Sequence, residues 1–379
     1  MQWGVYIHIP FCRQKCFYCD FPSFAGKENR MEAYVEALCQ QVKIQGLSYW
    51  QKWGIPATIY IGGGTPTALP QALMEKVLAA VTEIFGAEIG EFTVECNPGT
   101  VDEDYFKILR AGGVNRLSFG VQSFQDILLK KIGRIHSGAE ACEAVKLAQQ
   151  AGFVNISVDL MYGLPGQSLT DLQASVAQAD ALGIQHISIY GLQVEEGTAF
   201  ARMEEMGKLN LPTEDEAEAM YDYMTNRLPQ LGYRRYEVSN FAKAGFESRH
   251  NRSYWHDVPY LGLGAAAHSY LEGKRYAAVT DIEAYTAGIK KGQEIWELEE
   301  EPSLEHAMEE FAFLALRTAE GISRKAFRDK FQRELDEVYG KVMADLSNQG
   351  LLLVDQAGCR LTEKGFKYGN LAFAEFILS

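Results

Sequence analysis

The alternation of short apolar runs with helical segments constrains the fold of this chain most strongly. Six such runs occur before residue 191, and a helical pattern separates each from the next. Strands that alternate with helices form parallel βαβ units, in which helices cover both faces of the sheet. The sequence predicts strands at Gly4–Ile9, Thr58–Ile61, Glu91–Glu95, Arg116–Phe119, Ile156–Leu160 and His186–Tyr190. It predicts helices between them at Met31–Gln45, Gln71–Phe85, Asp102–Ala111, Ala139–Gln150 and Leu169–Leu182.

The number of these units limits the architecture. Six units occupy about 190 residues, whereas a closed barrel of this type needs eight. The sequence therefore predicts an α/β fold, either a partial (βα)6 barrel or an open parallel sheet. In both, the loops that follow the strands face the functional site.

The remainder of the chain divides into two further regions. We expect a barrel domain over 1–232, which ends with an acidic helix at Thr213–Leu231, and a glycine- and aromatic-rich extension over 233–300. The charged segment Glu297–Pro302 is predicted to be a break. Residues 301–379 are predicted to form a small winged-helix-like α+β domain. Its predicted elements are helices at His306–Ala319, Arg324–Gln332 and Leu335–Gln349, and a hairpin of Gly350–Val354 and Cys359–Thr362.

The charge balance argues against nucleic acid as a partner. The 379-residue chain has 36 Lys and Arg against 50 Asp and Glu, a net charge of −14, and such a surface repels phosphate backbones. From Glu300 to Ser379 there are ten basic and fourteen acidic residues, so the predicted winged-helix domain is not expected to bind DNA. The sequence shows neither a signal peptide nor an apolar run of membrane-spanning length. We therefore expect a cytoplasmic protein.

Three of the seven cysteines, Cys12, Cys16 and Cys19, lie within eight residues directly after the first predicted strand. Clustered thiolates select zinc, copper(I) or an iron–sulfur cluster. Three thiolates can hold three irons of a cubane and leave the fourth iron open to a substrate. A zinc site would need a fourth ligand, for which His8 and Cys96 are candidates. The spacing leaves both interpretations open, beside a packing role for the thiols.

A glycine-rich segment and a set of polar residues follow the later strands. The segment Gly62-Gly63-Gly64-Thr65-Pro66-Thr67 lacks the residues of a P-loop or a dinucleotide fingerprint. Its bare backbone allows a ligand to approach closely, although such a segment is also typical of a tight turn. Polar side chains at strand ends bind ribose hydroxyls or carboxylates, or merely cap the strand. The candidates are Glu95, Gln122, Arg134 and Asp159.

Together these motifs resemble the radical S-adenosylmethionine (SAM) superfamily. Within it, the stretches YIHIPFC, GGGTPT, GVQSF and DLMYGLP resemble the oxygen-independent coproporphyrinogen III oxidase-like family. The resemblance implies a [4Fe-4S] cluster on Cys12, Cys16 and Cys19, whose open iron takes the amino and carboxylate groups of SAM. It further implies that the SAM pocket is formed by Tyr6, Tyr18, Gly63, Gly64, Thr65, Glu95, Gln122, Arg134 and Asp159.

Two departures from that family change the expected activity. Its decarboxylating members carry a fourth cysteine two positions after the third, where this chain has Phe21. They also carry an extension ahead of the first strand, which here begins at residue 4. The chain instead contains an HNxxYW motif at 250–255, a combination similar to the HemW branch. Members of that branch bind heme and deliver it to apoproteins. The alternative is oxidative decarboxylation of coproporphyrinogen III to protoporphyrinogen IX through a 5′-deoxyadenosyl radical.

The resemblance therefore implies heme, an apo-hemoprotein acceptor and an electron donor to the cluster as partners; peripheral contact with a membrane is compatible with the sequence. Neutral imidazole is a common heme ligand. Among the seven histidines, His8, His136, His186, His250, His256, His268 and His306, we select His250, which Tyr254 and Trp255 flank. A structural histidine at this position is the open alternative.

Overall fold

A large curved sheet forms the body of the molecule. The computed structural model describes residues 2–378. The sheet has twelve strands in the order β12-β11-β10-β9-β1-β2-β3-β4-β5-β6-β8-β7. Its parallel centre consists of β1 (Gly4–Ile9), β2 (Thr58–Gly63), β3 (Glu91–Cys96), β4 (Arg116–Gln122), β5 (Asn155–Tyr162) and β6 (His186–Gly191). These are the six predicted strands, and the α/β fold with a mostly parallel sheet is confirmed.

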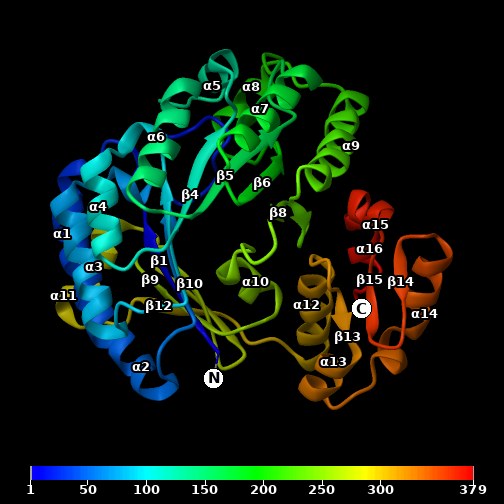
Figure 1. The fold of residues 1–379 in the computed structure, drawn as a ribbon. Helices are drawn as coiled ribbons and strands as arrows, with labels where there is room; N and C mark the ends of the chain where they lie inside the picture. The colour runs from blue at the N-terminus through cyan, green and yellow to red at the C-terminus, as the bar shows by residue number, and fades with distance from the viewer. Residues whose placement is uncertain (1, 379) are drawn as a thin grey trace.

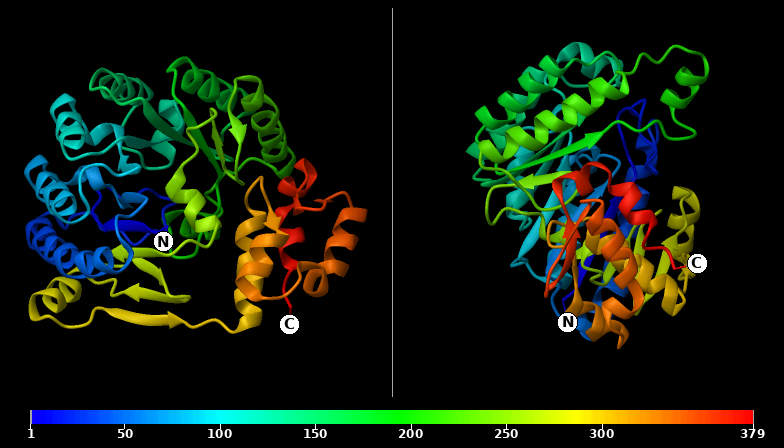
Figure 2. Two further views of the ribbon diagram at one scale, coloured as in Figure 1. Left: turned by 60° about the horizontal axis from the view of Figure 1, so that its bottom comes forward. Right: turned by 90° about the vertical axis from the view of Figure 1, so that its right-hand side faces the viewer.

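Helices lie along the outside of the curved sheet (Figures 1 and 2). The predicted helix Met31–Gln45 corresponds to α1 and most of a π-helical turn at Val42–Gly46, and the chain then continues into α2, which was not predicted. Ser137 and Ser168 begin α6 and α7 with capping boxes, which satisfy amide groups at the helix start. The helices of this region are α1 (Met31–Gln41), α2 (Leu47–Trp53), α3 (Gln71–Phe85), α4 (Glu103–Ala111), α5 (Asp126–Lys131), α6 (Gly138–Gln150), α7 (Leu169–Ala181), α8 (Ala199–Glu205) and α9 (Glu214–Gln230).

The two faces of the central strands differ in polarity. In β3, Phe92 and Val94 pack into the main hydrophobic core against the helices, while Glu91, Thr93 and Glu95 alternate with them on the opposite, inner face. The other central strands show the same alternation. The expectation of helices on both faces is therefore wrong for this sheet: it curves around a polar interior, and the helices cover its outer face.

The extension after α9 enlarges the sheet at both edges and adds two helices. The strands are β7 (Arg234–Arg235), β8 (Asn240–Ala242), β9 (Tyr260–Leu263), β10 (His268–Leu271), β11 (Lys274–Ala278) and β12 (Trp296–Glu300), and the helices are α10 (Arg249–Trp255) and α11 (Ile282–Lys291). The predicted break at Glu297–Pro302 is wrong for its first part, because β12 pairs antiparallel with β11 over those residues. The acidic side chains of β12 lie on an edge strand, where charge discourages pairing with another chain.

The C-terminal region forms a separate hydrophobic core. The three predicted helices and the hairpin are present, with a short added strand; the winged-helix assignment itself stays a prediction. The elements are α12 (Leu304–Leu316), β13 (Ile322–Ser323), α13 (Arg324–Phe331), α14 (Leu335–Asn348), β14 (Leu352–Val354), β15 (Gly358–Leu361), α15 (Glu363–Lys367) and α16 (Gly369–Ala374). A bridge between Glu237 and Thr318 joins this region to the sheet. No helix among residues 2–378 has the length and apolar character needed to cross a bilayer.

Candidate cluster and SAM site

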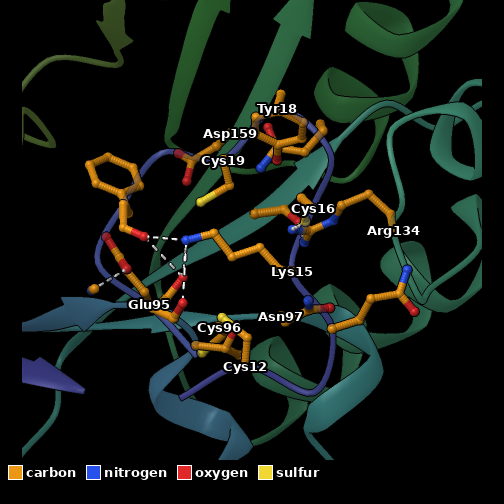
Figure 3. A pocket seen from close by; sticks show the side chains of 18 of the residues that line it. Cys12, Lys15, Cys16, Tyr18, Cys19, Glu95, Cys96, Asn97, Arg134 and Asp159 are labelled. Atoms are coloured by element: carbon orange, nitrogen blue, oxygen red, sulfur yellow. Dashed lines mark hydrogen bonds between the residues drawn. The ribbon is translucent and has the colours of Figure 1, made fainter. Parts of the chain in front are cut away.

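A cavity of about 400 Å³ opens at the carboxyl ends of the central strands. The strand ends of a parallel sheet converge there, so side chains far apart in the sequence meet. Of the residues assigned by resemblance to the cluster and SAM, all but Tyr6 line this cavity (Figure 3). They are Cys12, Cys16, Tyr18, Cys19, Gly63, Gly64, Thr65, Glu95, Gln122, Arg134 and Asp159.

The three thiols lie on the loop after β1, which is fixed from several sides. The Lys15 ammonium donates to the carbonyl oxygen of Phe21 at 2.5 Å and to that of Ser23 at 3.3 Å. The Thr65 hydroxyl donates to Cys12 Sγ at 3.6 Å, and Arg134 Nη1 donates to Cys16 Sγ at 3.5 Å. Burial raises the pKa of both Cys12 and Cys19. A positively charged metal centre offsets this penalty, because it binds the thiolate form.

A mononuclear zinc site would need a fourth ligand beside the three thiols. Among residues 2–378, no three side chains of the metal-binding types are arranged to hold one ion. His8 is not free as a fourth ligand, because Nδ1 is 2.9 Å from the Tyr6 hydroxyl and Nε2 is 2.9 Å from the Pro22 carbonyl oxygen. A cubane distributes its three cysteines over three irons, so its sulfur ligands stand farther apart than those of a single ion.

The glycine segment brings the end of β2 against the cysteine loop. The Gly64 amide donates to the Ile9 carbonyl oxygen at 2.9 Å, and the Thr65 amide donates to that of Phe11 at 2.8 Å. A Cβ at Gly64 would approach Phe11 O to 2.8 Å and Cys12 Sγ to 3.0 Å. Gly63 has φ +112°, and a Cβ there would lie 2.5 Å from the His8 ring. Only glycine fits this cradle without displacement of its neighbours.

Gly63→Ala is therefore expected to destabilise the protein by about 3 kcal/mol or more, since steric overlap adds to backbone strain. Gly54→Ala is the matched control, because Gly54 also has a positive φ of +79° but has open space around its Cβ position. Because the ψ of −158° places Gly54 in a backbone region that almost only glycine occupies, we expect that change to cost about 1–3 kcal/mol from backbone strain alone. Urea unfolding of both variants measures the difference, and equal losses would show that the His8 contact contributes nothing.

Two carboxylates form the polar wall of the cavity. The Tyr60 hydroxyl donates to Glu95 Oε1 at 2.7 Å, and the Gly63 amide donates to Oε2 at 3.1 Å. Enclosure by the protein raises the pKa of Glu95 to about 7, more than these hydrogen bonds lower it. Asp159 accepts from Ser188 at 2.7 Å and from Ser118 at 3.3 Å, and desolvation raises its pKa also. Both groups can accept hydrogen bonds from hydroxyls of a ligand.

Two candidate residues lie away from the cavity wall. Tyr6 is near the middle of β1 and bonds His8, so it is below the cavity and not in its wall. His250 is fully buried in α10. Its Nδ1 is 2.8 Å from the Thr58 hydroxyl and its Nε2 is 2.8 Å from the Tyr254 hydroxyl. Neither nitrogen is available to iron, so the geometry supports the structural alternative for His250 and not the heme assignment.

Several residues of the cavity wall were not selected from the sequence: Lys15, Asn97, Ser118, Met161 and Tyr190. Ser118 and Tyr190 occupy inward positions of β4 and β6. The alternation of polar and apolar residues within these two strands indicated that one face is polar. This pattern was not used, because the strands were interpreted as buried on both faces. Lys15 stands between two of the clustered cysteines, where its charge lies beside the thiols.

Comparison with known proteins agrees with this fold. The radical SAM superfamily model matches residues 6–179, and a model described as the HemN C-terminal domain matches residues 303–367. The coproporphyrinogen III oxidase HemN of Escherichia coli has the same fold, with a TM-score of 0.85, 21% identity, and coverage of 99% of this chain and 90% of that one. The protein is thus a member of the radical SAM superfamily.

Full-length relatives narrow the class further. The heme chaperone HemW of Bacillus subtilis is 39% identical over 99% of both chains. That of Lactococcus lactis is 39% identical over 99% of this chain and 97% of its own. The HemW of Escherichia coli is 41% identical over 70% of this chain and 69% of its own. Within the superfamily, the chain belongs to the same family as these HemW proteins.

Membership of the superfamily implies a [4Fe-4S] cluster and SAM, and the residues present fit both groups. The donor set is three soft thiols on one loop, with no fourth cysteine two positions after the third, because that position is Phe21. Beside them stands a glycine cradle that a Cβ would fill. Two carboxylates and Arg134 complete a polar wall. The thiols suit an iron–sulfur cluster, and the glycine cradle and polar wall suit the methionine and ribose groups of SAM.

Proposed function

We propose that this chain is a heme chaperone, which binds heme and delivers it to apo-hemoproteins. The observation that carries the proposal is the similarity to curated heme chaperones over nearly the entire chain. The residue at position 21 supports it. Phe21 is 63% exposed and lines the cavity, and its ring offers no ligand where decarboxylating members of the oxidase family place a cysteine.

We assign the cavity of the same protein to the cluster and SAM. Cys12, Cys16 and Cys19 hold the cluster, and the backbone at Gly63, Gly64 and Thr65 meets the methionine amino group. Glu95 accepts from the ribose hydroxyls, and Gln122, Arg134, Asp159 and Tyr18 complete the wall. When bound and reduced, the cluster supplies one electron for cleavage of the S–C5′ bond of SAM. The residues of this chain exclude water and orient the ligand.

We propose that the heme ligand is a residue other than His250, because both ring nitrogens of His250 are hydrogen-bonded within the protein. A histidine ligand needs an accessible imidazole, and three histidines are exposed: His256, His268 and His306. The first two form ion pairs with Glu320 and Glu299, which would hold their rings in place. We propose the acceptor apo-hemoprotein and an external electron donor as partners. We propose the cytoplasm as the compartment, since the three half-buried cluster thiols need a reducing environment.

Titration of the anaerobically purified protein with heme tests the proposal. We expect saturable binding, followed by transfer of heme to an apo-hemoprotein such as apo-myoglobin, measured by its Soret band. Iron and sulfide analysis of the same sample reports the cluster. Absence of saturable heme binding would overturn the chaperone assignment and leave the cluster assignment standing.

Coproporphyrinogen III oxidation is the second candidate, because the fold matches that of HemN over 99% of the chain. At 21% identity this match shows the fold alone, and the relatives of higher identity are heme chaperones. Anaerobic turnover with coproporphyrinogen III separates the two functions. We expect no protoporphyrinogen; its formation with stoichiometric 5′-deoxyadenosine would establish the oxidase.

A further inference from the structure

The short helix α10, which carries the HNxxYW motif, lies between the sheet and the C-terminal region (Figure 1). It contacts both β2 and α12. Glu91, at the start of β3, accepts from the amides of Arg249 at 2.9 Å and His250 at 2.8 Å. On the other side, Glu320 pairs with Arg252 and with His256. The helix is thus fixed from both sides, and the proposed function does not use it.

Within this helix, both ring nitrogens of His250 are hydrogen-bonded. Its side chain is fully buried, and burial lowers the pKa of the imidazole to about 3, so the ring is neutral. A neutral imidazole has one donor and one acceptor nitrogen. The hydroxyls of Thr58 and Tyr254, each at 2.8 Å, satisfy both. These two bonds leave the ring no freedom to rotate.

The ring of His250 supports a tyrosine that is hydrogen-bonded to a residue of the cavity wall. The Tyr60 ring stacks on His250, with centroids 5.1 Å apart and an interplanar angle of 23°. Tyr60 also stacks on Tyr6, at 6.2 Å and 26°. The Tyr60 hydroxyl then donates to Glu95 Oε1 at 2.7 Å. A continuous path of contacts therefore connects the motif helix to a carboxylate of the cavity wall.

We propose that His250 is a positioning residue of the cavity, which acts through Tyr60 to hold the Glu95 carboxylate in the orientation that accepts the ribose hydroxyls of SAM. The inference rests on the proposed assignment of the cavity to SAM and gives the HNxxYW motif a role in that site. His250 itself touches no ligand. Its contribution is the fixed plane on which Tyr60 stacks, and a displaced Tyr60 would release one oxygen of Glu95.

The chain supplies a matched control in His186. It is also fully buried, and its ring nitrogens are likewise bonded to a serine hydroxyl and a tyrosine hydroxyl, Ser157 at 2.7 Å and Tyr236 at 2.8 Å. Tyr236 accepts from the Ser248 amide beside the same helix, and it does not line the cavity. Replacement of His186 thus causes comparable loss of buried hydrogen bonds without loss of support for Tyr60.

The test compares SAM affinity in His250→Phe, Tyr254→Phe and His186→Phe, each with its cluster reconstituted. Tyr254→Phe removes one hydroxyl and keeps the ring, so it tests the proposal even where His250→Phe folds poorly. We expect His250→Phe to weaken SAM about tenfold, the effect of one misplaced hydrogen bond to a charged group, and Tyr254→Phe to weaken it less. His186→Phe is expected to bind SAM as the parent does. An analogue of SAM without ribose hydroxyls is expected to bind all four proteins equally.

Three outcomes would overturn the inference: unchanged SAM affinity in both motif variants, an equal loss in His186→Phe, or an equal loss for the analogue. Two further measurements support it if the role is one of positioning. His250→Phe should add no loss in a Glu95→Gln background, and it should keep the heme affinity of the parent protein. Failure of the parent protein to bind SAM with a full cluster would instead overturn the assignment of the cavity, on which this inference rests.

Discussion

Cys16→Ser is expected to abolish the cluster, reducing the iron and sulfide content from about four of each per chain to none. A serine hydroxyl is a hard, weakly acidic donor that does not replace a soft thiolate, and the loop has only three thiolates to give. SAM binding should be lost with the cluster, because the amino and carboxylate groups then have no open iron to bind. Iron and sulfide analysis, the visible absorption of the cluster and equilibrium dialysis with SAM measure these losses.

Cys96→Ser is the matched control for this prediction. Cys96 is also a buried thiol that lines the cavity, and burial raises the pKa of its thiol strongly. Because the Cys96 thiol donates to the Val94 carbonyl oxygen at 3.8 Å and lies outside the loop that carries the other three cysteines, we expect Cys96→Ser to retain full iron and full SAM affinity. Loss of iron in this variant would mean that Cys96 occupies the fourth iron, which contradicts the assignment of an open coordination site.

The central strands were predictable because their signals are local. Apolar residues bounded by turns mark each strand, as at Gly4–Ile9, where the predicted and observed limits agree. The cavity was predictable for a topological reason: parallel strands bring their carboxyl ends to one edge, so Glu95 and Asp159 meet although 64 positions separate them. Neither conclusion needs knowledge of how distant segments pack.

The features that the sequence did not predict depend on contacts between distant segments. Ser248 caps the start of α10, but Glu91, more than 150 positions earlier, accepts hydrogen bonds from its first amides. The same distant packing buries His250 and occupies both of its nitrogens. In β12, four consecutive residues of a charged segment form a strand because β11 offers a free edge. Local sequence patterns do not predict such contacts, because the contacting residues are far apart in the chain.

A pH dependence of SAM affinity is the second large effect that we expect, and it follows from Glu95. The pKa of this carboxyl is about 7 in the ligand-free protein. The ionised form accepts hydrogen bonds from two ribose hydroxyls, whereas the protonated form gives up part of that capacity. The ionised fraction falls from about nine-tenths at pH 8 to about one-tenth at pH 6. SAM affinity is therefore expected to fall by up to about tenfold over this interval.

Glu95→Gln should remove this dependence, because an amide does not titrate, and should weaken SAM at pH 8 by about tenfold or more. Glu237→Gln is the control: Glu237 is another buried carboxyl with a raised pKa, but it lies at the junction with the C-terminal region and does not line the cavity. It should keep the parent profile. A parent protein whose SAM affinity is the same at pH 6 and pH 8 would contradict the role of an ionised Glu95.

The raised pKa of Glu95 also determines how the stability of the ligand-free protein changes with pH. Because the folded, ligand-free chain holds the Glu95 proton up to about pH 7 and the unfolded chain releases it near the ordinary value of 4.5, the folded state binds more protons between these limits. The contribution of Glu95 to stability is therefore present at low pH and is lost as pH rises through this window. Thermal unfolding without ligand should show Glu95→Gln gaining stability relative to the parent at pH 8 and not at pH 4.5. The carboxylate thus destabilises the empty cavity in its ionised form, and the ribose hydroxyls of the bound ligand are what would compensate it.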